Sequence, residues 1–177
     1  MILGKEAILK EVKLGNLKIE PFDSNNIKGS SIDLTLDNKF RMFYRDVESD
    51  DYRKYSKLIT KDEIILEPGD FILGITKEKI TLKNLCGWLQ GRSTYARIGL
   101  GIHVTANFVH PGVSNKQVLE IKNLNNYKIK INAGMKICQL IVERVEGKYV
   151  LIMNRAVNAV KGAYTALWNS VVTPKKE

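Results

Sequence analysis

Apolar and polar residues alternate along much of the chain, and this alternation predicts β-strands. The first two expected strands are Ile32–Leu36 and Lys39–Phe43, which are joined by a short polar turn. Two further strands are expected at residues 63–66 and 71–75, on either side of a Pro-Gly-Asp turn at 68–70.

The middle of the chain continues this pattern with shorter units. Between Gly87 and Val142, apolar runs alternate with turns at a spacing of about 8–12 residues. This spacing is typical of a sandwich or barrel, so we expect a mainly β fold built from antiparallel strands. Ser93–Arg97 differs, because it is small and polar and can open a helical turn whose backbone N–H groups face an anion.

The N-terminus follows a helical period instead. Ile8, Leu9 and Val12 fall on one face of a helix, and Gly15 follows as a C-cap. Residues 1–15 are therefore predicted to form a short N-terminal helix with its cap.

A chain of 177 residues fits one domain. No internal repeat or interdomain linker divides it. Residues 154–177 have weak periodicity and are interpreted as a C-terminal arm that docks elsewhere or orders late. We therefore predict a single domain over residues 1–177.

The composition is ordinary for a folded soluble protein, with 44% hydrophobic and 27% charged residues. No apolar run approaches the ~20 residues of a membrane span. Residues 1–13 carry charges where a signal peptide needs an apolar centre, so we expect a cytoplasmic protein. The net charge of +9 comes from scattered basic residues. This charge indicates either a lysine-rich solvated surface or a polyanionic partner, such as a nucleoside triphosphate or a nucleic acid. Because the basic residues form no arginine-rich block and no ladder with aromatic residues, nucleic acid is an unlikely partner.

Cysteine and histidine are scarce. Cys86 and Cys138 each lie in an apolar stretch and are expected to be buried thiols. Together with His103 and His110 they do not have the spacing of a zinc site. The sequence therefore predicts no zinc site.

Two features point to chemistry at particular residues. The glycine-bounded turn Gly91–Leu100 places Arg92 and Arg97 around two hydroxyl residues, a combination that can hold phosphate oxygens but is also found in solvated surface turns. Glu120 falls within an apolar strand, where a carboxylate is costly unless it is paired. It is either an ion-paired scaffold residue or a tuned acid–base group.

The order of motifs around these residues resembles the dCTP deaminase branch of the dUTPase-related superfamily. The similar segments are Gly29–Leu36, Glu67–Gly74, Gly91–Leu100, His103–Ala106, His110–Gly112, Val118–Asn123 and Ala133–Leu140. The resemblance implies a dUTPase-like antiparallel β fold that assembles as a homotrimer, with active sites between subunits. It also implies dCTP or dUTP as ligand, with Mg²⁺ carried by the triphosphate and not by protein ligands.

The resemblance further implies the roles of individual residues. Glu120 matches the catalytic glutamate, which moves protons between the attacking water, N3 and the 4-amino group of cytosine. Arg97 and Ser93 match residues beside the base, and Arg97 is expected to keep Glu120 charged. The residues implied in nucleotide binding are Arg92, Ser93, Thr94, Tyr95, Ala96, Arg97, Ala106, His110, Val118, Leu119, Gln139, Lys161 and Tyr164.

Two departures from the family pattern leave alternatives open. His110 stands where many members have an aspartate that contacts the sugar, and it is either a sugar contact or a cap of the following turn. In the C-terminal motif Lys161 and Tyr164 remain, but a second lysine and two glutamines do not. The leading hypothesis is deamination of dCTP to dUTP and ammonia. A dUTP pyrophosphatase or bifunctional enzyme is the first alternative, and a non-catalytic nucleotide-binding relative is the second.

Overall fold

The computed structural model describes residues 1–44 and 55–147. Residues Met1–Val145 form one compact unit, to which the elements below belong. The predicted C-terminal arm, with Lys161 and Tyr164, lies outside the described residues.

The predicted N-terminal helix is present as α1, Lys5–Lys13. Ile8 on its apolar face is fully buried. The helix ends at Leu14, and Gly15 follows with a φ of 69°, a left-handed conformation that glycine adopts without steric cost. The helix and its termination are therefore both confirmed.

The strands form two larger sheets and one small pair, and every pairing is antiparallel. One sheet has the order β5-β4-β7-β11-β9, with β1 also paired to β7. Its strands are β1 (Leu17–Glu20), β4 (Lys39–Phe43), β5 (Ser56–Thr60), β7 (Phe71–Leu82), β9 (Leu100–Ile102) and β11 (Ser114–Asn123).

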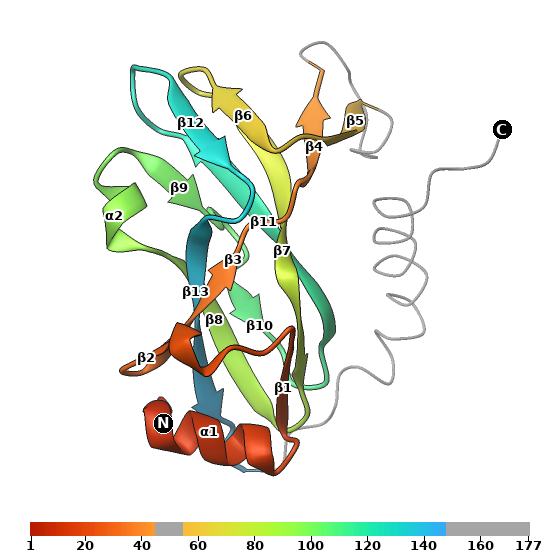
Figure 1. Cartoon of the computed structure of the whole chain (residues 1–177), viewed down its shortest axis with the longest axis vertical. Coiled ribbons are helices and arrows are strands. Elements are labelled where there is room, and N and C mark those ends of the chain that lie inside the picture. Colours follow the sequence, from red (N-terminus) through yellow and green to blue (C-terminus); the bar gives the residue numbers. More distant parts are fainter. Residues whose placement is uncertain (45–54, 148–177) are drawn as a thin grey trace, which may run out of the picture. The chain divides into compact units, whose positions relative to one another are not determined.

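The second sheet has the order β10-β8-β13-β3-β2. Its strands are β2 (Ile27–Lys28), β3 (Ser31–Thr35), β8 (Leu85–Gly91), β10 (Phe108–Val109) and β13 (Lys136–Arg144), while β6 (Glu63–Leu66) and β12 (Ile129–Asn132) form the separate pair. A 3-10 turn, η1 (Ser24–Asn26), precedes β2, and the helical turn expected after Gly91 is present as α2 (Ser93–Ala96). Figure 1 shows these elements.

Side chains from both larger sheets meet in one hydrophobic core. Leu34 and Leu140 come from the second sheet, and Ile72, Ile80 and Leu119 from the first, and all five are almost fully buried. The two sheets thus cover each other's apolar faces, which is the packing of a β-sandwich. The prediction of a mainly β, antiparallel fold is confirmed.

The predicted strands match β3, β4 and β6 within one residue, but β7 is seven residues longer than its predicted end at Ile75. The reason is Glu78, which is buried where a strand pattern needs an apolar residue, between the exposed Lys77 and Lys79. Its carboxylate accepts hydrogen bonds from the backbone N–H and the hydroxyl of Thr35. Because Glu78 is polar but faces inward, the alternation of apolar and polar residues did not predict the part of β7 after Ile75.

Both cysteines are buried and unpaired, as expected. Burial raises the pKa of the Cys138 thiol well above its usual range. Over residues 1–44 and 55–147, no helix is long and apolar enough to span a membrane.

Candidate active site

Glu120 lies near the middle of β11, on the face that points away from the core. Its neighbours Leu119 and Ile121 are fully buried, whereas the Glu120 side chain is half-buried. The strand alternation therefore places the carboxylate at the surface of the sheet. This removes the cost of full burial that the sequence suggested.

The Glu120 carboxylate is held by the loop that follows β9. The backbone N–H of Thr105 donates to Oε2 at 2.7 Å, and the Thr105 hydroxyl lies 2.9 Å from Oε1 and 2.7 Å from Oε2. Within the described residues the carboxylate has no ion pair. The structure thus gives no support to the reading of Glu120 as an ion-paired scaffold residue.

His103 fixes the start of the same loop against Glu120. Its backbone N–H donates to the Glu120 carbonyl at 2.7 Å, and its Nδ1 accepts a longer bond of 3.4 Å from the Glu120 N–H. Its φ of 58° is in the left-handed region, which is uncommon for a residue other than glycine. We call Glu120, His103, Thr105 and Ala106 the Glu120 cluster.

The environment of His103 favours a neutral imidazole. Burial lowers the pKa of His103, although the nearby Glu120 charge and a hydrogen bond with the Ala106 backbone oppose this shift. A neutral ring can accept at Nδ1, as the contact with the Glu120 N–H requires.

The turn around α2 carries six of the thirteen residues implied in nucleotide binding, at positions 92–97. Ser93, Thr94, Ala96 and Arg97 are exposed, whereas Tyr95 packs against the core. The Arg97 side chain makes no hydrogen bond or ion pair within the described part of the chain. Its predicted contact with Glu120 is therefore not made within this chain, and stays a prediction for neighbouring subunits.

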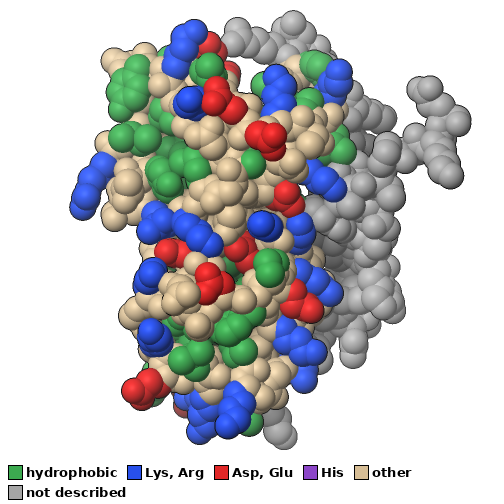
Figure 2. Space-filling model, viewed as in Figure 1, with side chains coloured by type: hydrophobic (Ala, Val, Ile, Leu, Met, Phe, Trp, Pro, Cys, Tyr) green, Lys and Arg blue, Asp and Glu red, His purple; other side chains and the backbone are tan. Residues whose placement is uncertain are grey.

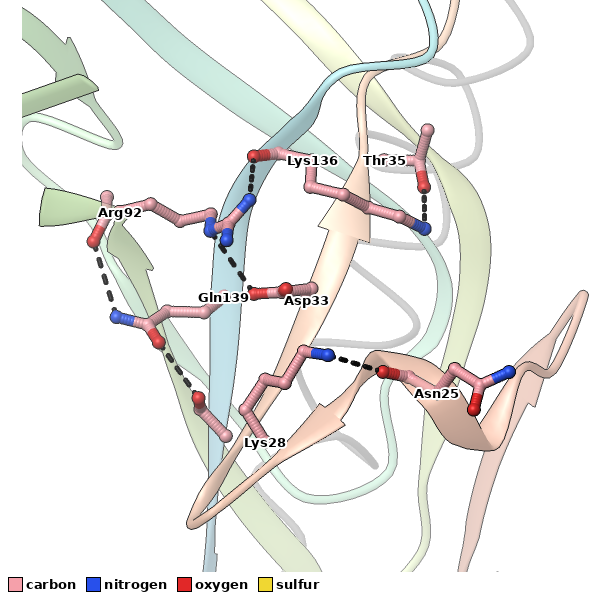
Figure 3. A network of polar contacts seen from close by, with 9 residues as sticks. Asn25, Lys28, Asp33, Thr35, Arg92, Lys136 and Gln139 are labelled. Carbon is pink, nitrogen blue, oxygen red and sulfur yellow. Dashed lines mark hydrogen bonds and ion pairs between the residues drawn. The ribbon is translucent and has the colours of Figure 1, made fainter. Parts of the chain in front are cut away.

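Arg92, at the start of the same turn, points instead to the second sheet. Its Nε lies 3.3 Å from Asp33 Oδ1, and its Nη1 donates to the Lys136 carbonyl at 3.0 Å. Gln139 donates to the Gly91 carbonyl at 3.4 Å and accepts from the Ser31 hydroxyl at 2.8 Å. We call Ser31, Asp33, Arg92, Lys136 and Gln139 the Arg92 cluster (Figure 3).

His110 is exposed and packs against another aromatic ring. Its imidazole lies edge-on to Phe108, with ring centroids 4.6 Å apart, and Phe108 in turn lies 4.8 Å from Trp88. The His110 carbonyl also accepts from the Val113 N–H across the turn that contains Gly112. Both interpretations of His110 therefore remain open. Its backbone carbonyl closes the turn, as a cap would, and its side chain is accessible for a contact with the sugar.

The remaining predicted residues differ in access. Val118 is half-buried on the same face of β11 as Glu120, whereas the Leu119 side chain is fully buried in the core. Any contact of Leu119 with a nucleotide must therefore use its backbone. No three His, Cys, Asp or Glu residues among those described are grouped to hold a metal ion.

Comparison with known proteins assigns this arrangement to a family. The family model described as dCTP deaminase-like matches residues 2–145, which include both clusters. The chain belongs to the dCTP deaminase-like family.

Relatives within the family cover most of the chain. A protein named dCTP deaminase, dUMP-forming, from Mycolicibacterium vanbaalenii is 38% identical over 154 residues, which is 82% of this chain and 81% of that protein. A protein named dCTP deaminase from Marinomonas sp. is 38% identical over 177 residues, which is 90% of this chain and 91% of that protein.

A solved structure supports the fold. The crystal structure of 2′-deoxycytidine 5′-triphosphate deaminase from Agrobacterium tumefaciens superposes with a TM-score of 0.65 at 18% identity. The match covers 88% of this chain, but the chain spans only about half, 53%, of that structure. At this identity the likeness concerns the fold alone.

The structure adds residues to the site of this dCTP deaminase-like chain that the sequence did not single out. Thr105 and His103 belong to the His103–Ala106 motif but had no individual role, and Asp33 and Ser31 lie in a motif near the N-terminus. The sequence could have indicated these residues only through the motifs that contain them. Their contacts depend on pairing between strands far apart in sequence, which spacing along the chain does not reveal.

Proposed function

We propose that this chain catalyses the hydrolytic deamination of dCTP. The observation that carries the proposal is the Glu120 carboxylate, held by Thr105 on an accessible strand face in a member of the dCTP deaminase-like family. A positioned, accessible carboxylate is suited to general acid–base chemistry.

In the proposed reaction Glu120 moves protons and a water molecule supplies the oxygen. Glu120 takes a proton from the water as the water oxygen bonds to C4 of cytosine, and passes it to N3. Glu120 then takes the remaining hydroxyl proton and passes it to the 4-amino group, so that the C4 carbonyl forms as the C4–N bond breaks and ammonia leaves. Water and dCTP thus give dUTP and ammonia, with Glu120 regenerated.

The substrate is proposed to bind through the turn around α2. Arg92, Ser93, Thr94 and Arg97 offer charged and neutral donors to the phosphates, which carry Mg²⁺ as part of the substrate. We also propose that no zinc is needed, because the two cysteines and two histidines do not have the spacing of a zinc site.

The proposed assembly is a homotrimer in which Arg97 of one subunit approaches Glu120 of another. Support comes from exposed apolar side chains around α2, β9 and the turn after β11. They are Ile98, Val104, Leu124 and Tyr127, each at least 39% exposed. Figure 2 shows hydrophobic side chains on this side of the molecule. Such a patch is typical of a subunit contact. A stable active monomer in light scattering would contradict this assembly.

A second candidate is a bifunctional enzyme that hydrolyses dUTP to dUMP. It is favoured by the name dUMP-forming of the relative from Mycolicibacterium vanbaalenii. Against it stands His110, which replaces the aspartate expected to orient the hydrolytic water and cannot act as the same anionic base. We therefore propose that dUTP is the released product.

The deciding experiment is incubation of the full chain with dCTP and Mg²⁺, followed by separation of dUTP, dUMP and pyrophosphate. Accumulation of dUTP with ammonia supports the proposal. Formation of dUMP and pyrophosphate supports the bifunctional candidate. Tight binding of dCTP without any product would identify a non-catalytic relative.

A further inference from the structure

We propose that Asp33 is a positioning residue for the triphosphate. In this role it holds the Arg92 guanidinium through Nε, so that Nη2 can donate to phosphate oxygens. The inference rests on the proposed function, because it assumes that dCTP binds at the turn around α2.

The first support is the unequal burial of the two partners. The Asp33 side chain is 7% exposed, whereas the Arg92 side chain is 32% exposed. A carboxylate this buried needs a charged or hydrogen-bonding partner, and Arg92 supplies it at 3.3 Å. Asp33 is thus committed to Arg92, while Arg92 retains access to solvent.

The second support is the division of the guanidinium itself. Nε faces Asp33, and Nη1 donates to the Lys136 carbonyl. The Nη2 group makes no hydrogen bond with any residue of the described part of the chain. Since a guanidinium is a rigid planar fork, fixing one side also fixes the direction of the other.

The third support is the strand register, which aligns Asp33 with residues at the end of β8, next to the turn around α2. Asp33 on β3 pairs with Gln139 on β13, and Gln139 pairs with Gln90 on β8. Directly paired residues on antiparallel strands point to the same face. This polar row ends at Gln90, two residues before Arg92, so the ion pair between Asp33 and Arg92 crosses β13, the strand between β3 and β8.

Hydrogen bonds on both sides of Asp33 also hold this region in place. Gln139 holds the Gly91 carbonyl and is itself bound by Ser31. On the other side of Asp33, the Lys136 ammonium donates to the Thr35 hydroxyl, which is bound to the buried Glu78. Figure 3 shows Asp33 between these two groups. The first residues of the turn are therefore attached to the second sheet by side-chain hydrogen bonds and an ion pair.

The test separates phosphate binding from folding and from catalysis. Asp33→Asn keeps the shape of the side chain and removes its charge. We expect the dissociation constant for dCTP to rise about tenfold, the loss of one charge-assisted hydrogen bond. We expect the constant for 2′-deoxycytidine, which has no phosphates, to stay within about twofold, and kcat at saturating dCTP to change less than KM.

The matched control is Asp37→Asn. Asp37 also forms an ion pair, with Lys116 at 2.7 Å, but contacts no residue of the turn around α2. It should leave the ratio of the two dissociation constants unchanged. If Asp33→Asn does not fold, Arg92→Lys serves as the second variant. It keeps a charge beside Asp33 but loses the planar fork, and should show the same selective loss for dCTP.

The outcomes distinguish the inference from the proposed function. Equal weakening of dCTP and 2′-deoxycytidine, or no change in either, would overturn the role of Asp33. The same holds if Arg92→Lys binds dCTP as the parent does. Failure of the parent chain to bind or deaminate dCTP would instead overturn the proposed function.

Discussion

The two clusters of the site are built in opposite ways. The Arg92 cluster joins charged side chains across three strands, and its acid, Asp33, is almost fully buried. The Glu120 cluster lies at the surface of a strand, and its acid is held by the backbone and hydroxyl of one loop residue, Thr105. No hydrogen bond or ion pair between described residues joins the two clusters.

This difference indicates a division of labour. Buried charges with full partners resist movement, because breaking the pair leaves an unpaired charge. A carboxylate held by a neutral hydroxyl on a half-exposed loop can be released at lower cost. The first arrangement suits the binding of a fixed phosphate chain, and the second suits a group that must exchange protons.

The largest effect should come from removing the Glu120 carboxylate. Glu120→Gln keeps an oxygen to accept from Thr105 but cannot take up a proton, so turnover of dCTP should fall by about 10²–10⁴-fold or more. Binding of dCTP should persist, because the Arg92 cluster is untouched. Steady-state kinetics and calorimetric binding measure the two quantities.

Glu143→Gln is the matched control for this variant. Glu143 is also a half-buried strand glutamate, but its carboxylate accepts a hydrogen bond from the Trp88 indole at 3.2 Å and not from the loop after β9 that holds Glu120. Its substitution should leave turnover near the parent value. Activity of Glu120→Gln within tenfold of the parent would contradict the catalytic role.

A third acid, remote from both clusters, tests whether charge removal acts locally. Glu11 on α1 is 5% exposed and accepts from Asn16 at 2.8 Å and from Arg144 at 2.9 Å. These two bonds lower the pKa of Glu11 in the folded state. We expect Glu11→Gln to reduce the free energy of unfolding at neutral pH by about 1–3 kcal/mol, with kcat and KM for dCTP unchanged.

The sign of the pH dependence follows from the lowered pKa. The contribution of Glu11 is present above its unfolded pKa, near 4.5, and is lost as the pH falls through the lower folded value. The difference in the free energy of unfolding between the parent and Glu11→Gln, measured with a denaturant, should therefore become smaller below about pH 4. Glu6→Gln, on the exposed face of the same helix, is the control. A gap that is constant with pH would contradict this role.

A smaller effect on turnover is expected at Thr105. Thr105→Val removes the hydroxyl and keeps both the shape and the backbone N–H bond to Glu120. Without the hydroxyl the carboxylate is less well oriented, so kcat should fall about tenfold, the value of one hydrogen bond to a charged group. Thr105→Ser retains the hydroxyl and should recover most of the activity. Equal kcat values for the two variants would show that the hydroxyl has no part in turnover.

The sequence predicted the fold well where strands follow simple alternation. Residues 39–43 and 63–66 were placed without error, because one face of each strand is apolar. β7 was cut short because Glu78 faces inward, and its partner Thr35 lies 43 residues away. Polar residues that satisfy each other inside a sandwich give no local signal.

The same limit applies to the site. Glu120 and the turn at Gly91–Leu100 were found from residue type and motif. Their supporting residues were not found, since Thr105 is 15 residues from Glu120 and Asp33 is 59 residues from Arg92. Such contacts are set by strand pairing. The roles of Lys161 and Tyr164 stay predictions, because both lie outside the described residues.

The smallest expected effect concerns His110, which belongs to neither cluster. Its imidazole is exposed and lies edge-on to Phe108. If it contacts the sugar, the contact is similar in the ground state and the transition state. His110→Ala should therefore raise KM for dCTP several-fold and change kcat less. Phe108→Leu should raise KM for dCTP by a smaller factor, because it removes the aromatic contact of the His110 imidazole but leaves the imidazole itself.

His110→Asp sharpens this test, because it introduces the residue type that the family resemblance implies at this place. A carboxylate at this place can accept a proton from water, which a ring engaged in one hydrogen bond to a sugar does less readily. The variant should keep deaminase activity and gain some hydrolysis of dUTP to dUMP, measured with dUTP as sole substrate. A parent-like KM in His110→Ala would remove His110 from the sugar pocket and leave it as a cap of the Pro111–Gly112 turn. In that case the Asp variant should gain no activity on dUTP either, since a side chain outside the pocket cannot orient the water.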